Sequence, residues 1–156
     1  MIIKLSNNKT DTQILVDYLK AVDEDFVMPL SSKVDLLELA QKTLEYGYAY
    51  IALENGNVVA LVTFYCNDKA NAKAFLPILS VKKEFRGKGY ARKLVNIVID
   101  VSRLHEMQMV CVDSINPVAI GLYKSVGFKT IRVDESHGIR KEYLQLTIPA
   151  IGNTSC

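Results

Sequence analysis

The sequence predicts an α/β fold of the α+β type, in which helices flank a mostly antiparallel sheet. Between residues 48 and 81, three apolar segments separated by turns indicate a meander of antiparallel strands. Residues 74–112 then follow the order strand, helix, strand, because a segment with apolar residues at helical spacing lies between two apolar runs. The 156 residues suffice for one domain with a real core, which we assign to residues 1–148, leaving residues 149–156 as a C-terminal tail.

The N-terminal third is predicted to contain one strand and two helices. Residues 2–5 are apolar enough for a short strand, and Thr10 or Asp11 is expected to cap the first helix. The second helix is expected to start at Ser31 and to end at Gly47. Apolar residues recur at helical spacing in both segments, which indicates that each helix buries one face.

The remaining elements follow from hairpin, capping and periodicity signals. Asn55-Gly56 indicates a tight hairpin. Asn116 and Pro117 suit the start of a short helix, and the hydrophilic residues 134–141 are expected to form a loop. The predicted strands are residues 48–53, 57–66, 73–81, 107–112, 128–133 and 143–148, and the predicted helices are residues 90–104 and 117–126.

Composition and charge exclude several classes of function. The net charge of +2 is too small to indicate a nucleic-acid-binding protein. No apolar run approaches the roughly 20 residues of a membrane-spanning helix, and the first residues do not form a signal peptide. The cysteines Cys66, Cys111 and Cys156 lack the spacing of a metal site, and their odd number favours a reducing compartment. We therefore expect a cytoplasmic protein without bound metal, and without a nucleic acid or a membrane as partner.

A basic turn with two glycines separates an apolar strand from the helix that follows. Gly87 and Gly89 lack a Cβ, so the backbone can approach a ligand closely there. The positive end of the helix and its free N–H groups favour a phosphate at this point. The turn therefore predicts a phosphate-binding loop. Only one acid, Glu84, accompanies its cations, which are Lys82, Lys83, Arg86, Lys88, Arg92 and Lys93.

Two common phosphate-binding motifs do not match this loop, and a third does. The Walker pattern is absent, and a dinucleotide fingerprint would require a glycine at the position of Arg92. Arg86-Gly-Lys-Gly-Tyr-Ala91 instead resembles the Arg/Gln-x-x-Gly-x-Gly/Ala pyrophosphate loop of the GCN5-related N-acetyltransferase (GNAT) family. Residues 116–128 are similar to a second block of that family, Asn-x-x-Ala-x-x-Leu-Tyr-x-x-x-Gly-Phe. The two motifs occur in the family's order and at the expected distance.

The resemblance, which covers residues 2–147, implies both a fold and a co-substrate. The implied fold is a mixed, mostly antiparallel sheet of about seven strands, splayed between the fourth and the fifth and flanked by about four helices. Acetyl-coenzyme A would bind in this splay, with its pantetheine arm paired to the backbone of the fourth strand. The positions that match the family's coenzyme-binding residues are Leu79, Ser80, Val81, Arg86, Gly87, Lys88, Gly89, Tyr90, Ala91, Asn116 and Tyr123.

The resemblance also suggests how the reaction would proceed. Tyr123 matches the family's tyrosine that protonates the departing thiolate, although a core tyrosine is the alternative. Asn116 matches a residue that reaches the coenzyme arm, and it also suits a helix cap. Some members carry a glutamate base on the fourth strand, but residues 73–81 contain no acid. Asp113 or a chain of water molecules remains as the general base.

The expected function is acetyl transfer to a primary amine of a small polar acceptor. Acceptor-binding residues are predicted at Phe26 and Met28 in an apolar loop, and at Tyr65 and Asn67 near the end of the third strand. The second region is similar to members that acetylate sugars, which suggests an amino sugar. O-acetylation, acetylation of a protein N-terminus or lysine, and a non-catalytic sensor that binds acetyl-coenzyme A remain as alternatives. The sequence leaves a homodimer open.

Overall fold

The computed structural model describes residues 1–149, and this part of the chain forms two compact units. The first unit contains residues 1–65 and 78–94, and the second contains residues 66–77 and the described residues from 95 onward. The single domain over residues 1–148 stays a prediction. Residues 150–156 of the predicted tail lie outside the described residues.

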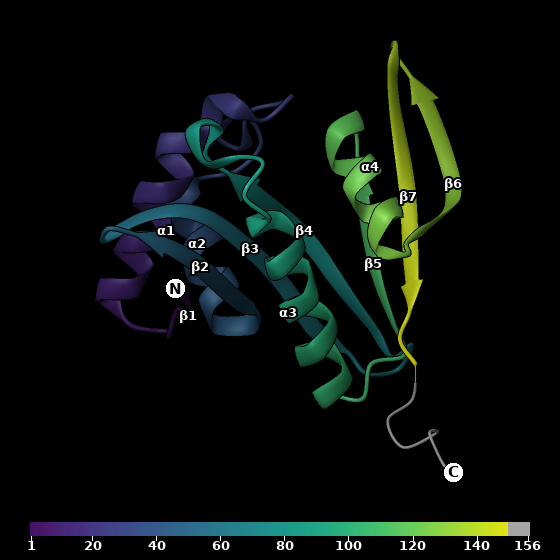
Figure 1. The fold of residues 1–156 in the computed structure, drawn as a ribbon, viewed down its shortest axis with the longest axis horizontal. Helices are drawn as coiled ribbons and strands as arrows, with labels where there is room; N and C mark the ends of the chain where they lie inside the picture. Colours follow the sequence, from purple (N-terminus) through teal and green to yellow (C-terminus); the bar gives the residue numbers. More distant parts are fainter. Residues whose placement is uncertain (150–156) are drawn as a thin grey trace. The chain divides into compact units, whose positions relative to one another are not determined.

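Within residues 1–149, seven strands form a mixed sheet in the order β1-β2-β3-β4-β5-β7-β6. The pairs β1–β2, β2–β3, β5–β7 and β6–β7 are antiparallel, whereas β4 and β5 are parallel. The architecture confirms the predicted fold class. Its strands are β1 (Ile2–Lys4), β2 (Tyr48–Glu54), β3 (Asn57–Asp68), β4 (Lys73–Val81), β5 (Met109–Ser114), β6 (Lys129–Ser136) and β7 (Ile139–Thr147). Its helices are α1 (Lys9–Val22), α2 (Leu36–Tyr46), α3 (Tyr90–Leu104) and α4 (Pro117–Val126), with the short 3-10 turns η1 (Asp23–Asp25), η2 (Leu30–Ser32) and η3 (Lys83–Phe85) (Figure 1).

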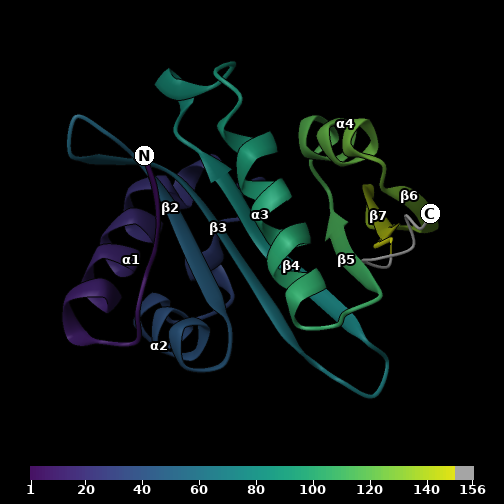
Figure 2. The ribbon, with the colours of Figure 1, turned by 60° about the horizontal axis from the view of Figure 1, so that its bottom comes forward.

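In the first unit, α1 and α2 lie side by side and pack on one face of the neighbouring strands (Figure 2). The core forms because the apolar stripe of each helix meets every second side chain of the strands. At the end of β4, the Lys82 N–H donates to the Val59 carbonyl oxygen of β3 over 2.8 Å. The buried core residues are Leu5, Leu15, Val16, Tyr18, Leu19, Val22, Leu36, Ala40, Leu44, Ala49, Ile51, Leu61 and Ile78.

Both N-terminal helices begin at caps that differ from the predicted ones. Asn8 caps α1 by accepting a hydrogen bond from the Asp11 N–H over 2.8 Å, so neither Thr10 nor Asp11 is the cap. Helix α2 begins after Asp35, which accepts from the Glu38 N–H over 3.0 Å.

Ser31, which was predicted to begin α2, forms hydrogen bonds to another segment instead. Ser31 lies in η2, where its N–H donates to the Asp23 carboxylate over 3.0 Å and its hydroxyl donates to the same group. These bonds lower the pKa of Asp23. Ser31 therefore supports a turn instead of a helix start.

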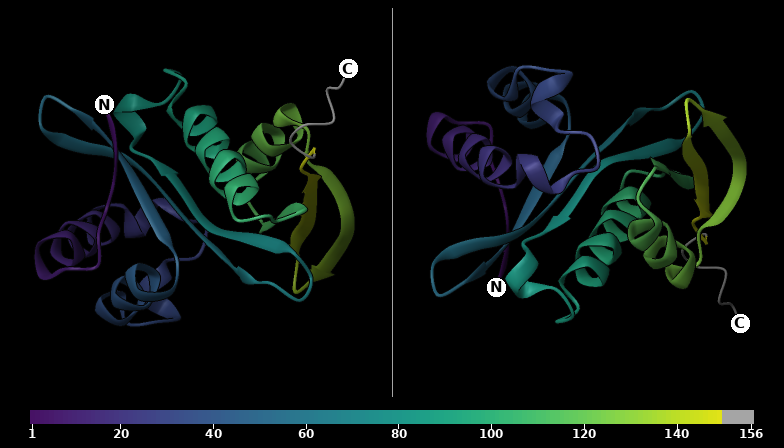
Figure 3. Two further views of the ribbon diagram at one scale, coloured as in Figure 1. Left: turned by 90° about the horizontal axis from the view of Figure 1, so that it is seen from below. Right: turned by 90° about the horizontal axis from the view of Figure 1, so that it is seen from above.

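In the second unit, β7 lies between β5 and β6, and α4 packs on one face of these strands (Figure 3). Lys124 of α4 pairs with Glu142 of β7 over 3.4 Å, which fixes the helix against that face. The loop predicted at residues 134–141 is instead paired backbone, from Asp134 opposite Lys141 to Ser136 opposite Ile139. The sequence did not predict this part of the hairpin because β6 is an exposed edge strand, whose polar residues do not alternate with apolar ones.

The parallel pairing of β4 with β5 is short. It joins Lys73, Ala74 and Phe75 to Met109, Val110 and Cys111. β4 continues for six residues beyond this register, to Val81, and β5 for three, to Ser114. The continuing part of β4 contains Leu79, Ser80 and Val81, at whose backbone the sequence predicts coenzyme binding.

Candidate functional site

The glycine loop of the first unit has the geometry of an anion-binding turn. Gly87 and Gly89 have φ angles of 82° and 86°, in the left-handed region that only glycine adopts readily. A Cβ at either position would meet no atom within 4 Å, so the loop backbone borders open space. α3 starts at Tyr90, and the N–H groups of its first turn have no acceptor within the helix.

Two side chains hold the end of β4 next to this loop. Arg86 Nε–H donates to the Val81 carbonyl oxygen over 3.0 Å. The Tyr18 hydroxyl, from α1, lies 3.3 Å from the Ser80 carbonyl oxygen and 3.1 Å from the Ser80 hydroxyl. Burial raises the pKa of Tyr18 to about 12, so this phenol is protonated at neutral pH. The predicted residues Ser80, Val81 and Arg86 therefore belong to one connected group.

A carboxylate that sequence reasoning missed also contacts the loop. Glu54, at the end of β2, pairs with Lys88 over 3.2 Å and accepts a hydrogen bond from the Tyr90 hydroxyl. The Tyr90 bond, followed by the Lys88 bond, lowers the pKa of Glu54, and the same bond raises the pKa of Tyr90. The cations of the loop are thus opposed by Glu54 as well as by Glu84. The one sequence signal for Glu54 is the Asn55-Gly56 hairpin, which places Glu54 at the end of a strand but does not predict its contact with the loop.

The second unit holds the predicted catalytic tyrosine. Tyr123 lies on α4, is 3% exposed, and packs against Phe128 with the ring centroids 5.4 Å apart. The Tyr123 hydroxyl makes no hydrogen bond with a described residue. Within residues 1–149, Thr63 Oγ1 is the only fully buried side-chain oxygen or nitrogen without a partner, so the Tyr123 oxygen is not fully buried. The Tyr123 oxygen therefore retains access to solvent or to a ligand. Burial, and next the charge of Asp113, raise the pKa of Tyr123 and keep it protonated.

The polar residues near α4 are partly occupied by structural roles. Asn116 caps α4 by accepting a hydrogen bond from the Val118 N–H over 2.9 Å, as its position before Pro117 predicted. Its contact with a coenzyme stays a prediction. Asp113 lies at the end of β5 and pairs with Lys141 over 3.4 Å.

The predicted acceptor-binding residues are distributed over both units. Phe26 packs against the core of the first unit, and Met28 is 40% exposed. The Tyr65 hydroxyl lies 3.5 Å from the Thr43 hydroxyl. Asn67 is exposed and belongs to the second unit. Their convergence on one acceptor stays a prediction.

Within residues 1–149, no helix is long and apolar enough to cross a membrane. The same residues contain no group of three His, Cys, Asp or Glu side chains arranged to hold a metal ion.

The chain matches the family model of the acetyltransferase (GNAT) family over residues 15–128. The chain belongs to this family. The match includes the glycine loop, Asn116 and Tyr123, and it confirms the family predicted from the sequence. The family model describes acetyltransferases, which agrees with the predicted enzyme class.

The chain is 28% identical to a probable N-acetyltransferase camello of Xenopus tropicalis over 118 residues, which are 73% of this chain and 54% of that protein. The chain therefore spans about half the length of this curated relative.

Solved GNAT structures share the fold. The ribosomal-protein-S18-alanine N-acetyltransferase of Escherichia coli has a TM-score of 0.76 at 18% identity, covering 100% of this chain and 99% of that one. A protein from Bacillus anthracis named as a putative streptothricin acetyltransferase, solved in complex with acetyl coenzyme A, has a TM-score of 0.61 at 19% identity, covering 67% and 64% of the two chains. The GNAT fold can thus hold the co-substrate that the sequence predicts.

Proposed function

We propose that the protein transfers the acetyl group of acetyl-coenzyme A to a primary amine of a small polar acceptor. The observation that carries this proposal is the loop from Arg86 to Ala91, within a chain of the GNAT family. Two left-handed glycines and a helix start leave several N–H groups directed at open space, where a pyrophosphate would be bound. Lys88 would add charge to this site once it leaves Glu54.

The backbone at the end of β4 supports the predicted pairing with the pantetheine arm and refines it. Backbone groups of successive strand residues point to opposite edges. The Lys82 N–H is directed to β3. The backbone N–H and C=O groups of Ser80 therefore also point to β3, whereas those of Leu79 and Val81 point to the opposite edge of β4. We therefore assign the pairing to Leu79 and Val81, and give Ser80 a supporting role through Tyr18.

The chemistry of the proposed reaction is direct attack of the amine on a thioester, which acetyl-coenzyme A supplies. A carbon–nitrogen bond forms, the carbon–sulfur bond breaks, and the sulfur leaves as a thiolate. Tyr123 is protonated and would give its proton to this sulfur as the general acid. The nitrogen loses its proton to Asp113 or to water, and Tyr123 regains a proton from solvent.

The acceptor is proposed to be an amino sugar. Met28 is exposed and Tyr65 is half-buried, so both can contact a ligand, and Asn67 offers donor and acceptor groups for hydroxyls. Transfer to a hydroxyl, to a protein N-terminus or to lysine are the competing outcomes of the test. We further propose that the protein acts in the cytoplasm.

The test combines binding with turnover. Calorimetry should show that acetyl-coenzyme A binds, and a thiol reagent should detect free coenzyme A only when a suitable amine is present. The panel contains amino sugars, polyamines, amino acids, N-terminal peptides and hydroxyl acceptors. Binding without thiol release from any acceptor would indicate the sensor, and turnover with peptides alone would contradict the small acceptor.

A further inference from the structure

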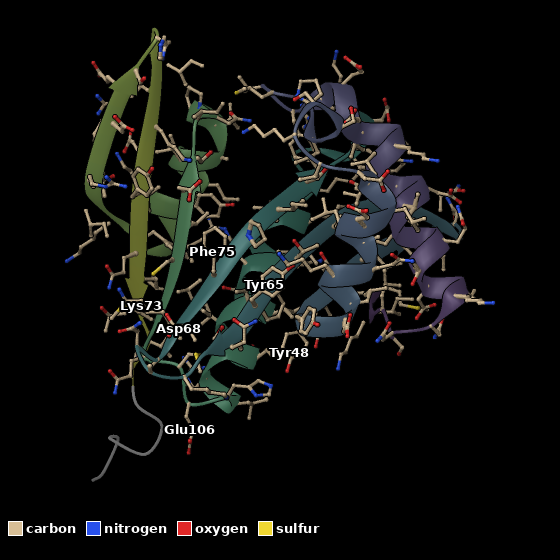
Figure 4. The ribbon with its side chains drawn as sticks, turned by 180° about the vertical axis from the view of Figure 1, so that it is seen from behind. Tyr48, Tyr65, Asp68, Lys73, Phe75 and Glu106 are labelled. Atoms are coloured by element: carbon tan, nitrogen blue, oxygen red, sulfur yellow. The ribbon has the colours of Figure 1, made fainter. Side chains whose placement is uncertain are left out.

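In the second unit, one face of the sheet is not covered by α4. That helix packs on the opposite face, where Val110, Val112 and Leu144 are at most 3% exposed. Figure 4 shows β5 and β7 in front of α4, so the open face is turned toward the viewer. On this open face, Phe75 of β4 is 41% exposed, opposite Cys111 of β5. Phe75 therefore offers an apolar side chain that a ligand on this face could contact.

Three strands contribute a continuous row of side chains to this face. Asp113 of β5 pairs with Tyr143 of β7, and Tyr143 pairs with Arg132 of β6. Directly paired residues project to the same side of a sheet, so the three side chains are neighbours. The row spans two strand spacings, or about 10 Å.

A β-bulge determines that an arginine ends this row. Thr130 pairs with Leu144, and regular alternation would then place Ile131 opposite Tyr143. The register shifts here, so that Arg132 takes this place and Ile131 is 62% exposed. Bulges of this type turn a side chain to a new direction and are frequent beside active sites.

The stacking of Arg132 leaves its hydrogen-bond donors free. The guanidinium carbon lies 3.9 Å from the centre of the Tyr143 ring. Stacking uses the face of the guanidinium, whereas its N–H groups point outward in its plane. None of these groups forms an ion pair or hydrogen bond with a described residue. Lys141, which lies 5.4 Å from the same ring, differs because Asp113 already neutralises it.

We propose that Arg132, held on Tyr143, binds an anionic group of the amine acceptor, so that the preferred acceptors carry a phosphate or a carboxylate. This inference rests on the proposed function and specifies its substrate class. A planar guanidinium matches both anions through paired hydrogen bonds. Asp113, a candidate general base, lies at the other end of the row. An acceptor along this row would therefore have its anion at Arg132 and its amine near Asp113.

The experiment uses acceptors that differ only in the anionic group. Glucosamine 6-phosphate is compared with glucosamine, and alanine with alaninamide. We expect at least one charged member to have a kcat/KM about 10–100-fold above its neutral partner, the gain typical of a charge-assisted hydrogen-bond pair. The phosphate and carboxylate arms show which anion is preferred. Equal kcat/KM values within both pairs would overturn the proposal.

Variants of the two arginines in the hairpin test the assignment. Arg132→Gln should raise KM for the charged acceptor about 10–100-fold and leave the neutral one unchanged, and Arg132→Lys should restore part of the loss. Arg140→Gln removes the same charge from the opposite face of the hairpin and should keep the preference. An equal effect on acetyl-coenzyme A affinity would assign Arg132 to the coenzyme and refute our placement.

Direct measurements of acceptor binding test this inference independently of the proposed function. Calorimetry of glucosamine 6-phosphate and of alanine, with wild type and Arg132→Gln, requires no turnover. Loss of binding in the variant supports the anion site even if no thiol is released, in which case the proposed reaction fails alone. Unchanged binding refutes the anion site even if amines are acetylated.

Discussion

Gly89→Glu should abolish coenzyme binding while the protein stays folded. The φ of 86° makes any side chain at position 89 unfavourable by about 1–2 kcal/mol, although no atom lies within 4 Å of a Cβ. For a chain of this size, that cost corresponds to a fall in Tm of about 2–8 °C. A carboxylate about 5 Å from a pyrophosphate with two charges adds about 1.7 kcal/mol of repulsion in water, or more than tenfold in Kd. The added bulk between the loop N–H groups and the phosphates should increase this loss.

Gly138→Glu is the matched control for this change. Gly138 also has a left-handed φ, of 77°, and open space at its Cβ, but it lies in the β6–β7 turn. Both variants should therefore lose similar Tm in a thermal melt, and calorimetry with acetyl-coenzyme A should separate them. Equal affinity of Gly89→Glu and Gly138→Glu would refute the placement of the pyrophosphate at the loop.

Three further changes address single hydroxyl groups. Tyr123→Phe should lower kcat by about 10²–10⁴-fold, with coenzyme affinity and Tm unchanged, and a full-speed variant would show that the tyrosine only packs. Thr63→Val should raise the free energy of unfolding by about 1 kcal/mol, because Thr63 Oγ1 is buried without a partner; a loss in urea denaturation would contradict this. Burial raises the pKa of Tyr18 to about 12 in the folded protein, so its stabilising effect is complete below pH 10 and is lost as pH rises through about 12. Wild type should lose roughly 3 kcal/mol more free energy of unfolding than Tyr18→Phe over this pH range, and an equal loss in the two proteins by urea denaturation would contradict this.

Local patterns predicted most of the fold. Apolar periodicity and the Asn55-Gly56 turn gave the meander, and Asn116, Pro117 and Gly127 gave the bounds of α4, which runs from Pro117 to Val126. The hairpin of β6 and β7 was underestimated, because an exposed edge strand has few apolar residues to mark its period. The start of α2 was missed because the side chain of Asp23 competes for Ser31, and such a contact between segments leaves no local signal.

In the candidate site, too, the sequence predicted local features but not contacts between distant residues. The glycine loop and the Asn116 cap depend on neighbouring residues, and both were predicted. Glu54 acts on a loop that lies 34 residues away from it in sequence, and Tyr18 acts on Ser80 over 62 residues. The position of Arg132 depends on a bulge in the register of two strands, which no spacing in the sequence reveals.

The pairing of Glu54 with the loop bears on the energetics of ligand capture. Lys88 and Tyr90 are already oriented by a carboxylate, so a pyrophosphate would compete for partners that are in use. Binding then resembles an exchange of one anion for another, and its free energy is the difference between two similar interactions. The rotamer of Lys88 is restricted beforehand, which reduces the entropy cost of binding. In the proposed reaction, a carboxylate that can reclaim its partners also favours the departure of coenzyme A, so the loop is suited to repeated turnover.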